Sequence, residues 1–109
     1  MSETLALKTF AGIYEYCNFI ITDEDFKNKI LNHLQNVLEN WSDSWAVIKK
    51  WLLEVEFHTK EQVLKNFIEQ IPHLQVFRDV ILVFVNRDSN FWENVYDNLH
   101  QCQSILKTE

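Results

Sequence analysis

The chain has 109 residues, of which 47% are hydrophobic and 24% are charged, a composition typical of a globular domain rather than a disordered segment. Its formal net charge is −6 and it has no cluster of lysines or arginines, which argues against a nucleic-acid partner. A single glycine and a single proline exclude glycine-rich phosphate-binding loops and a fold built on tight β-hairpins. The length suits one domain, residues 1–109, that buries a core without disulfides or a metal ion.

Targeting signals are absent from the sequence. The longest apolar run, Val80 to Val85, is too short to span a bilayer. Residues 1–4 lack the basic and then apolar pattern of a secretory signal. We therefore expect no membrane partner and, by default, a cytoplasmic location. Cys17 and Cys102 fall on apolar helix faces and are expected to be buried free thiols, because a disulfide would need an oxidising compartment.

The first half of the chain predicts three helices, each introduced by a residue that commonly caps a helix. We expect Ser2 to begin the first helix, Thr22 with Asp25 the second, and Ser42 the third. Gly12 lies inside the first helix, where it is expected to allow a close helix crossing. Apolar residues recur every three or four positions, as on one face of a helix. These positions are Leu7, Phe10, Ile13, Tyr14 and Cys17, then Phe26, Ile30, Leu34, Val37 and Trp41, then Trp45, Ile48, Leu52 and Val55.

Two further helices have clear boundaries. Thr59 and Gln62 form a capping box that opens the fourth helix. Pro72 ends that helix or begins the next one, because proline lacks a backbone N–H. Asp88 or Ser89 caps the last helix. The apolar positions are Val63, Leu64, Phe67, Ile68 and Ile71 in the fourth helix, and Phe91, Val95, Leu99, Cys102 and Leu106 in the last.

The segment from His73 to Asn86 is ambiguous in its periodicity. Leu74, Phe77 and Ile81 fit one face of a helix, whereas the run Val80–Val85 is rich in β-branched residues, as a buried strand would be. No other segment has a strand pattern, so a strand here would have no partner. We therefore predict a helix at the centre of the bundle.

Together these segments predict an all-α fold, a compact bundle of about six short helices. The caps at Thr22 and Thr59 are spaced like helical repeat units, but no residue pattern repeats with them, so a closed bundle is favoured over a solenoid. The residues that lie centrally on the apolar faces should form the core. They are Phe10, Ile30, Leu52, Phe67, Ile81 and Leu99.

The histidines and cysteines do not form a recognisable catalytic or metal-binding pattern. A di-metal bundle needs two Glu-x-x-His motifs, and the nearest approximation, Asp97-x-x-His100, occurs once. Cysteines in apolar surroundings are poor nucleophiles because burial raises the thiol pKa. Two His–Glu pairs with helical spacing are interpreted as solvated pairs: Glu54 with His58, and Glu69 with His73. We expect no enzymatic activity, no cofactor and no metal site.

Aromatic residues near the end of the third helix are the candidate functional residues. If Ile48, Leu52 and Val55 face the core, some large apolar side chains fall outside that face, where a surface helix should be polar. Either the helix is covered on both sides, or it exposes an aromatic patch to a partner. The candidate partner-binding residues are Trp51, Leu53, Glu54, Glu56 and Phe57. Trp41 and Trp45 should pack together at the preceding turn.

The leading functional hypothesis is a non-catalytic protein-interaction module: an adaptor, a regulatory partner or an inhibitor. Acidity and surplus aromatics favour a basic protein, or a second copy of the chain, as partner. Six short helices in about 100 residues is also similar to the helix count of death-fold interaction modules, an analogy of number only. The alternative is a small-ligand- or cofactor-binding bundle, which a dry internal cavity would favour.

Overall fold

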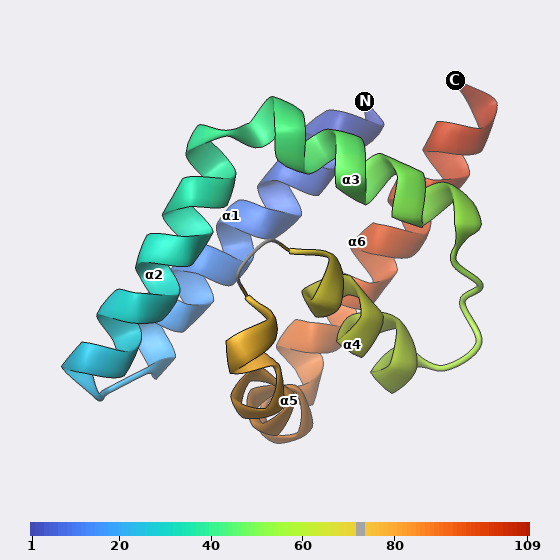
Figure 1. Cartoon of the computed structure of the whole chain (residues 1–109). Helices are drawn as coiled ribbons and strands as arrows, with labels where there is room; N and C mark the ends of the chain where they lie inside the picture. The colour runs from blue at the N-terminus through green and yellow to red at the C-terminus, as the bar shows by residue number, and fades with distance from the viewer. Residues whose placement is uncertain (72–73) are drawn as a thin grey trace.

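The computed structural model describes residues 1–71 and 74–109, and within them the chain forms six α-helices and no strand (Figure 1). The prediction of an all-α bundle of about six helices is confirmed. The helices are α1 (Ser2–Ile20), α2 (Glu24–Glu39), α3 (Trp41–Glu54), α4 (Lys60–Gln70), α5 (Arg78–Arg87) and α6 (Ser89–Thr108), with a short 3-10 helix η1 (Gln75–Phe77) before α5.

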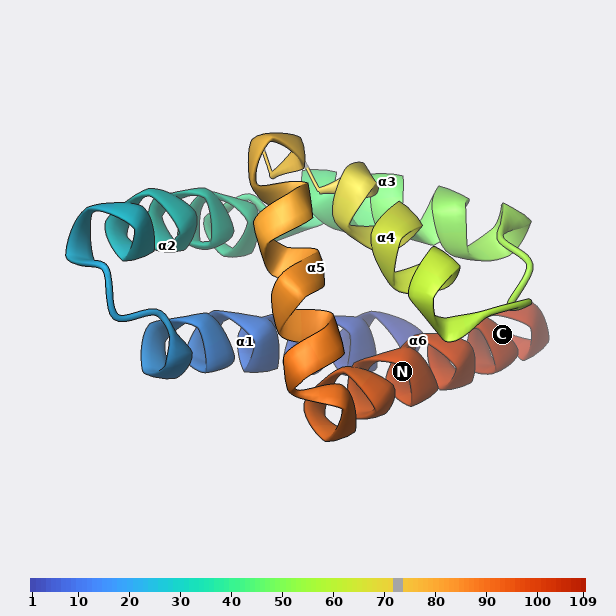
Figure 2. The same cartoon turned by 90° about the horizontal axis from the view of Figure 1, so that it is seen from below.

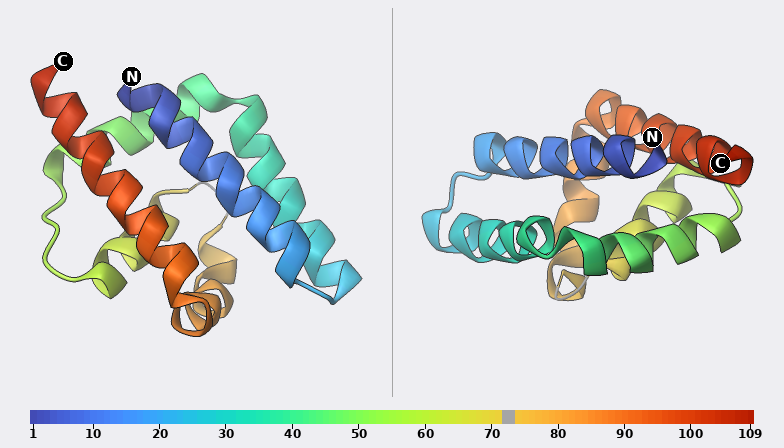
Figure 3. Two further views of the ribbon diagram at one scale, coloured as in Figure 1. Left: turned by 180° about the vertical axis from the view of Figure 1, so that it is seen from behind. Right: turned by 90° about the horizontal axis from the view of Figure 1, so that it is seen from above.

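The helices form two layers with two crossing elements. Helices α1 and α6 lie in one layer and α2 and α3 in the other, while α4 and α5 run obliquely between the layers (Figure 2). The chain termini lie close together, so α1 and α6 pack side by side and antiparallel (Figure 3). The radius of gyration is 13.2 Å, close to the value of about 13 Å expected of a compact chain of this length.

The core contains one of the predicted central residues from every helix. Each of the six is at most 2% exposed, so the predicted core is confirmed. The two thiols predicted to be buried and free are so as well. In chain order the six core residues are Phe10, Ile30, Leu52, Phe67, Ile81 and Leu99. The apolar periodicity therefore identified the central inward position of each helix correctly. Leu7, predicted on the inward face of α1, is 36% exposed, because the buried face centres on Ala6, Phe10, Ile13 and Cys17 and leaves Leu7 at its edge.

Helix caps were predicted less accurately. The Thr59 hydroxyl accepts the backbone N–H of Gln62 at 3.3 Å, as expected. At the start of α2, however, the cap is Asp23, whose carboxylate accepts the N–H of Phe26 at 2.9 Å. The prediction of Thr22 is wrong by one residue, because neighbouring Thr and Asp side chains can both serve as caps and only the backbone geometry selects one.

Two other cap predictions need correction, and a third is right in position only. Ser42 does not cap α3, which begins one residue earlier and follows α2 after the single residue Asn40. Ser2 lies within the first turn of α1, with Met1 at the cap position. Asp88 stands at the cap position of α6, as predicted, but makes no side-chain capping hydrogen bond. Its carboxylate accepts the hydroxyl of Tyr16 instead.

Helix α5 was predicted correctly as a helix and wrongly as the centre of the bundle. Ile81 and Val85 are buried, but Val80 is 39% and Val83 60% exposed. The helix packs against α4, α6 and η1, which leaves its opposite side open. The apolar run Val80–Val85 therefore overstates how completely the rest of the chain covers the helix.

Three smaller predictions concern single residues. A Cβ atom added at Gly12 would meet no atom within 4 Å, so the predicted close crossing is wrong. Trp41 and Trp45 stack with ring centroids 6.3 Å apart, as predicted. Helix α4 ends before Ile71, which is extended as a residue preceding proline should be. Two predictions fall outside the described residues: the helix boundary at Pro72, and the pair of Glu69 with His73.

Candidate functional site

The five predicted partner-binding residues lie on α3 and on the connection that follows it. Trp51, Leu53 and Glu54 belong to the last turn of α3, which ends at Glu54, earlier than the sequence suggests. Glu56 and Phe57 lie in the connection to α4. Leu53 is 48% exposed, and both glutamates are exposed. The five residues therefore do not share one helix face.

The two aromatic residues of the set pack in opposite directions. Trp51 is only 9% exposed and contacts Phe67 of α4, with ring centroids 5.6 Å apart. Phe57 stacks on His100 and meets Tyr96 edge-on, both on α6. The sequence allowed two interpretations of these aromatics: coverage by the rest of the chain, or an exposed patch. Trp51 packs on α4 and Phe57 packs on α6, so the two rings do not form one contiguous exposed patch.

A buried glutamine on α6 fixes the end of α3. The side-chain amide of Gln103 donates hydrogen bonds to the carbonyl oxygens of Leu52 and Val55, each at 2.8 Å. Carbonyls at a helix C-terminus have no partners within the helix, so these bonds satisfy two of them. Gln103 was not among the residues predicted from the sequence, although a polar residue between the apolar positions Leu99 and Leu106 was a visible signal.

A surface groove separates α3 from α4. One depression of about 570 Å³ lies between the middle of α3 and the end of α4, and a second of about 350 Å³ lies between the end of α3 and the start of α4. Trp51 and Glu54 line both, so the two are continuous. We call this the α3–α4 groove. Its walls are Val47, Lys50, Trp51 and Glu54 on α3, Glu56 and His58 on the connection, and Gln62, Asn66 and Gln70 on α4.

The α4 wall is a stripe of carboxamides. Gln62, Asn66 and Gln70 follow one another at intervals of four residues, which places them on one face of the helix. Their side chains make no hydrogen bond with any other described residue. Each carboxamide can both donate and accept. The groove is thus lined by hydrogen-bonding groups that the fold does not use.

The floor of the groove also carries an unused donor. Trp51 is about nine-tenths buried, yet its indole N–H donates no hydrogen bond within residues 1–71 and 74–109. This N–H is not among the side-chain atoms shut off from solvent, unlike those of Trp41 and Trp92. Trp51 lines both depressions, so this solvent-accessible donor belongs to a residue of the groove.

The end of the groove beside the α3 C-terminus is negatively charged. Its depression is lined by Glu54 and Glu56 and by no lysine or arginine. Glu56 lies 2.5 Å from the ring nitrogen of His58, and Glu54 forms no ion pair among the described residues. Gln103 already caps the carbonyls of Leu52 and Val55, so the two carboxylates supply the negative charge at this end. This end should attract a cation.

The cysteines, the Glu54–His58 pair and possible metal ligands are the other candidate sites of chemistry among residues 1–71 and 74–109. Burial raises the pKa of Cys17 to about 12 and that of Cys102 to about 11, which makes both thiols poor nucleophiles. No group of three or more potential metal ligands occurs among the residues with described positions. Because α3 ends at Glu54, the predicted pair of Glu54 and His58 does not share a helix face.

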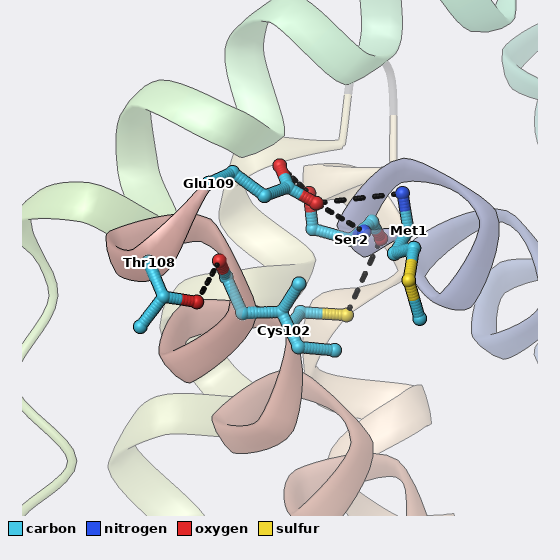
Figure 4. A network of polar contacts seen from close by, with 6 residues as sticks. Met1, Ser2, Cys102, Thr108 and Glu109 are labelled. Carbon is cyan, nitrogen blue, oxygen red and sulfur yellow. Dashed lines mark hydrogen bonds and ion pairs between the residues drawn. The ribbon is translucent and has the colours of Figure 1, made fainter.

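Two polar clusters in the α1–α6 layer serve the fold itself. The Tyr16 hydroxyl donates to Asp88, and burial together with this bond raises the pKa of Tyr16 above its ordinary range. At the chain ends, the Glu109 carboxylate accepts the backbone N–H of Ser2 at 3.0 Å and its hydroxyl at 2.9 Å (Figure 4). Both bonds lower the pKa of Glu109. This carboxylate satisfies free N-terminal donors of α1.

Comparison with known proteins adds no family. No protein-family model, no curated protein and no solved structure matches the chain. None of the described helices combines the length and the apolarity needed to cross a bilayer.

Proposed function

We propose that the chain is a non-catalytic protein-interaction module that binds another protein in the α3–α4 groove. The observation that carries the proposal is the set of unused hydrogen-bonding groups, namely the indole N–H of Trp51 and the carboxamides of Asn66 and Gln70. A partner that brings complementary groups would gain hydrogen bonds without breaking any within this chain.

The predicted partner-binding residues contribute unequally to this surface. Trp51 forms the floor of the groove, and Glu54 and Glu56 supply its charge. Leu53 and Val47 add exposed apolar area on the same helix, which a partner could cover. Phe57 lies on the side of α6 and supports the connection rather than the groove. The proposed site is thus displaced from the predicted one toward α4.

The alternative function, binding of a small ligand, has weaker support. A cavity near the turn between α2 and α3 has a volume of about 270 Å³ and is lined by His33, Asn36 and Asp43, among others. Sites for drug-sized ligands usually have a volume of about 300–1,000 Å³ and bury most of the ligand. This cavity is smaller than that range and opens at the surface, so we favour the protein partner.

Site-specific photo-crosslinking tests the proposal. A benzophenone amino acid is placed at Lys50, an exposed residue of the groove, and as a matched control at Lys29, an exposed lysine of α2 far along the chain. Each variant is irradiated in an extract of the cells from which the chain comes. We expect adducts of discrete mass at Lys50 and none at Lys29, and an adduct of twice the chain mass would identify a second copy as the partner. Absence of adducts at Lys50, or the same adducts at both positions, would overturn the proposal.

A further inference from the structure

We infer that the α3–α4 groove holds an extended segment of a basic partner, with an arginine or lysine side chain beside Glu54 and Glu56. This inference rests on the proposed function and specifies the chemistry of the partner. It follows from three features of the groove: the spacing of the carboxamides, the donor on its floor and the charge at one end.

The spacing of the α4 carboxamides matches an extended peptide. Residues four apart on a helix are separated by about 6 Å along its axis. Alternate residues of an extended chain, which present their backbone groups in the same direction, are about 6.7 Å apart. Gln62, Asn66 and Gln70 can therefore meet successive peptide groups on one edge of a strand-like segment. The stripe is about 12 Å long, which corresponds to about four extended residues.

The floor of the groove favours backbone over side-chain recognition. The Trp51 N–H can only donate, so its partner must be an acceptor such as a peptide carbonyl. The backbone of a helical ligand is already satisfied internally, and it would leave this donor and the carboxamides unused. An extended segment offers free carbonyl and N–H groups to both walls.

The charge of the groove sets the side chain that accompanies this backbone. Glu54 and Glu56 lie at the end where α3 terminates, and the nearest groove lysine, Lys50, is one helical turn back from Glu54. A cation placed there would meet the carboxylate of Glu54, which has no ion pair among the described residues, beside that of Glu56, which is paired with His58. Two carboxylates that line one depression make a basic side chain more favourable than an acidic one.

Nuclear magnetic resonance of the four tryptophan indole N–H groups tests the inference directly. The probes are a capped pentapeptide with arginine between alanines, and the same peptide with norleucine in place of arginine. At low salt the arginine peptide should shift the Trp51 indole signal saturably, whereas the buried indole groups of Trp41 and Trp92 serve as internal controls and should not move. The norleucine peptide should bind at least about threefold more weakly, the scale of an exposed ion pair.

Variants separate the two halves of the inference. Asn66→Ala should weaken both peptides, because it removes a backbone contact. The double variant Glu54→Gln, Glu56→Gln should weaken the arginine peptide by about threefold and leave the norleucine peptide unchanged. The control is Glu3→Gln, Glu15→Gln, which changes net charge equally on exposed positions of α1 and should alter neither affinity.

The outcomes distinguish this inference from the proposed function. Equal binding of the two peptides, or equal weakening by the α1 control, would overturn the basic-partner inference. A Trp51 signal that does not respond to either peptide would overturn the extended-segment inference. If discrete Lys50 adducts nevertheless form in the extract, the groove is an interaction site for a partner of another kind, such as a helix, and the proposed function stands.

Discussion

The α1–α6 layer and the α3–α4 groove use their polar side chains in opposite ways. In the layer, Ser2 is bonded to Glu109 and the hydroxyl of Tyr16 is bonded to Asp88. In the groove, the carboxamides of Gln62, Asn66 and Gln70 have no hydrogen-bond partner among the described residues. The difference suggests that polar groups of the layer stabilise the fold, whereas those of the groove are free for another molecule.

The largest expected difference between the two regions comes from the same substitution, leucine to alanine, made once in each region. Leu99→Ala removes a fully buried side chain of α6 and should lower the free energy of unfolding by about 2–5 kcal/mol. Leu53→Ala removes a half-exposed side chain beside the groove and should cost less than about 1 kcal/mol. Urea unfolding measures both. A loss below about 1 kcal/mol at Leu99 would show that the packing of α6 is described wrongly.

A second variant tests the contact that joins the two regions. Gln103→Met keeps the length of the side chain but leaves the carbonyls of Leu52 and Val55 without donors, which should cost about 1–3 kcal/mol. Gln101→Met, at an exposed position of the same helix, is the matched control and should be nearly neutral. Thermal unfolding measures both, and equal stability of the two variants would contradict the anchoring role of Gln103.

The tyrosine of the layer gives a pH-dependent prediction. Tyr16→Phe removes the hydrogen bond to Asp88 and should cost about 1 kcal/mol at pH 7. Because the folded-state pKa of Tyr16 is raised above the ordinary 10.0, its contribution is complete below pH 10 and is lost as the pH rises toward the folded-state value. The stabilities of the wild type and the variant should therefore converge above pH 10.

The control for this pH series is Tyr96→Phe, a half-buried tyrosine whose hydroxyl makes no hydrogen bond with the described residues. Urea unfolding between pH 7 and pH 11 should show a stability difference from wild type at pH 7 that is smaller for Tyr96→Phe than for Tyr16→Phe. A Tyr16→Phe curve that stays parallel to the wild-type curve above pH 10 would show that burial does not hold the hydroxyl protonated.

The smallest expected effect belongs to the groove itself. Asn66→Ala and Gln70→Ala should each change the free energy of unfolding by less than about 0.5 kcal/mol, because neither side chain has a partner to lose. Chemical denaturation is again the measurement. A loss of more than about 1 kcal/mol would assign these amides to the fold and would remove the contrast between the two regions.

Trp51 shows how far the sequence could define the site. The spacing along the helix predicted that Trp51 lies at the edge of the apolar face. The structure confirms this position, because the Trp51 ring packs against Phe67 and the residue also lines the groove. Trp51→Ala should therefore destabilise the fold, so it is unsuitable as a test of binding. The place of Asn66 in the groove was not visible, because only the tertiary structure sets α3 opposite this side of α4.

Helix α5 shows the corresponding limit for the fold. Its apolar run predicted deep burial, but Val83 remains exposed because no other helix covers that side. Periodicity and composition report which positions of a segment are apolar; they do not report how many neighbours the segment will have. The same limit affected the cap of α2, where local chemistry allowed both Thr22 and Asp23.

The sequence by itself determined the all-α fold, the central inward position of each helix, the stacked Trp41 and Trp45, and the cap at Thr59, because these depend on residues close together along the chain. The tertiary structure alone decided the exposure of α5, the anchoring of α3 by Gln103, and the α3–α4 groove. These features depend on the distances between helices, and such distances are set by the packing of the whole core rather than by any local pattern.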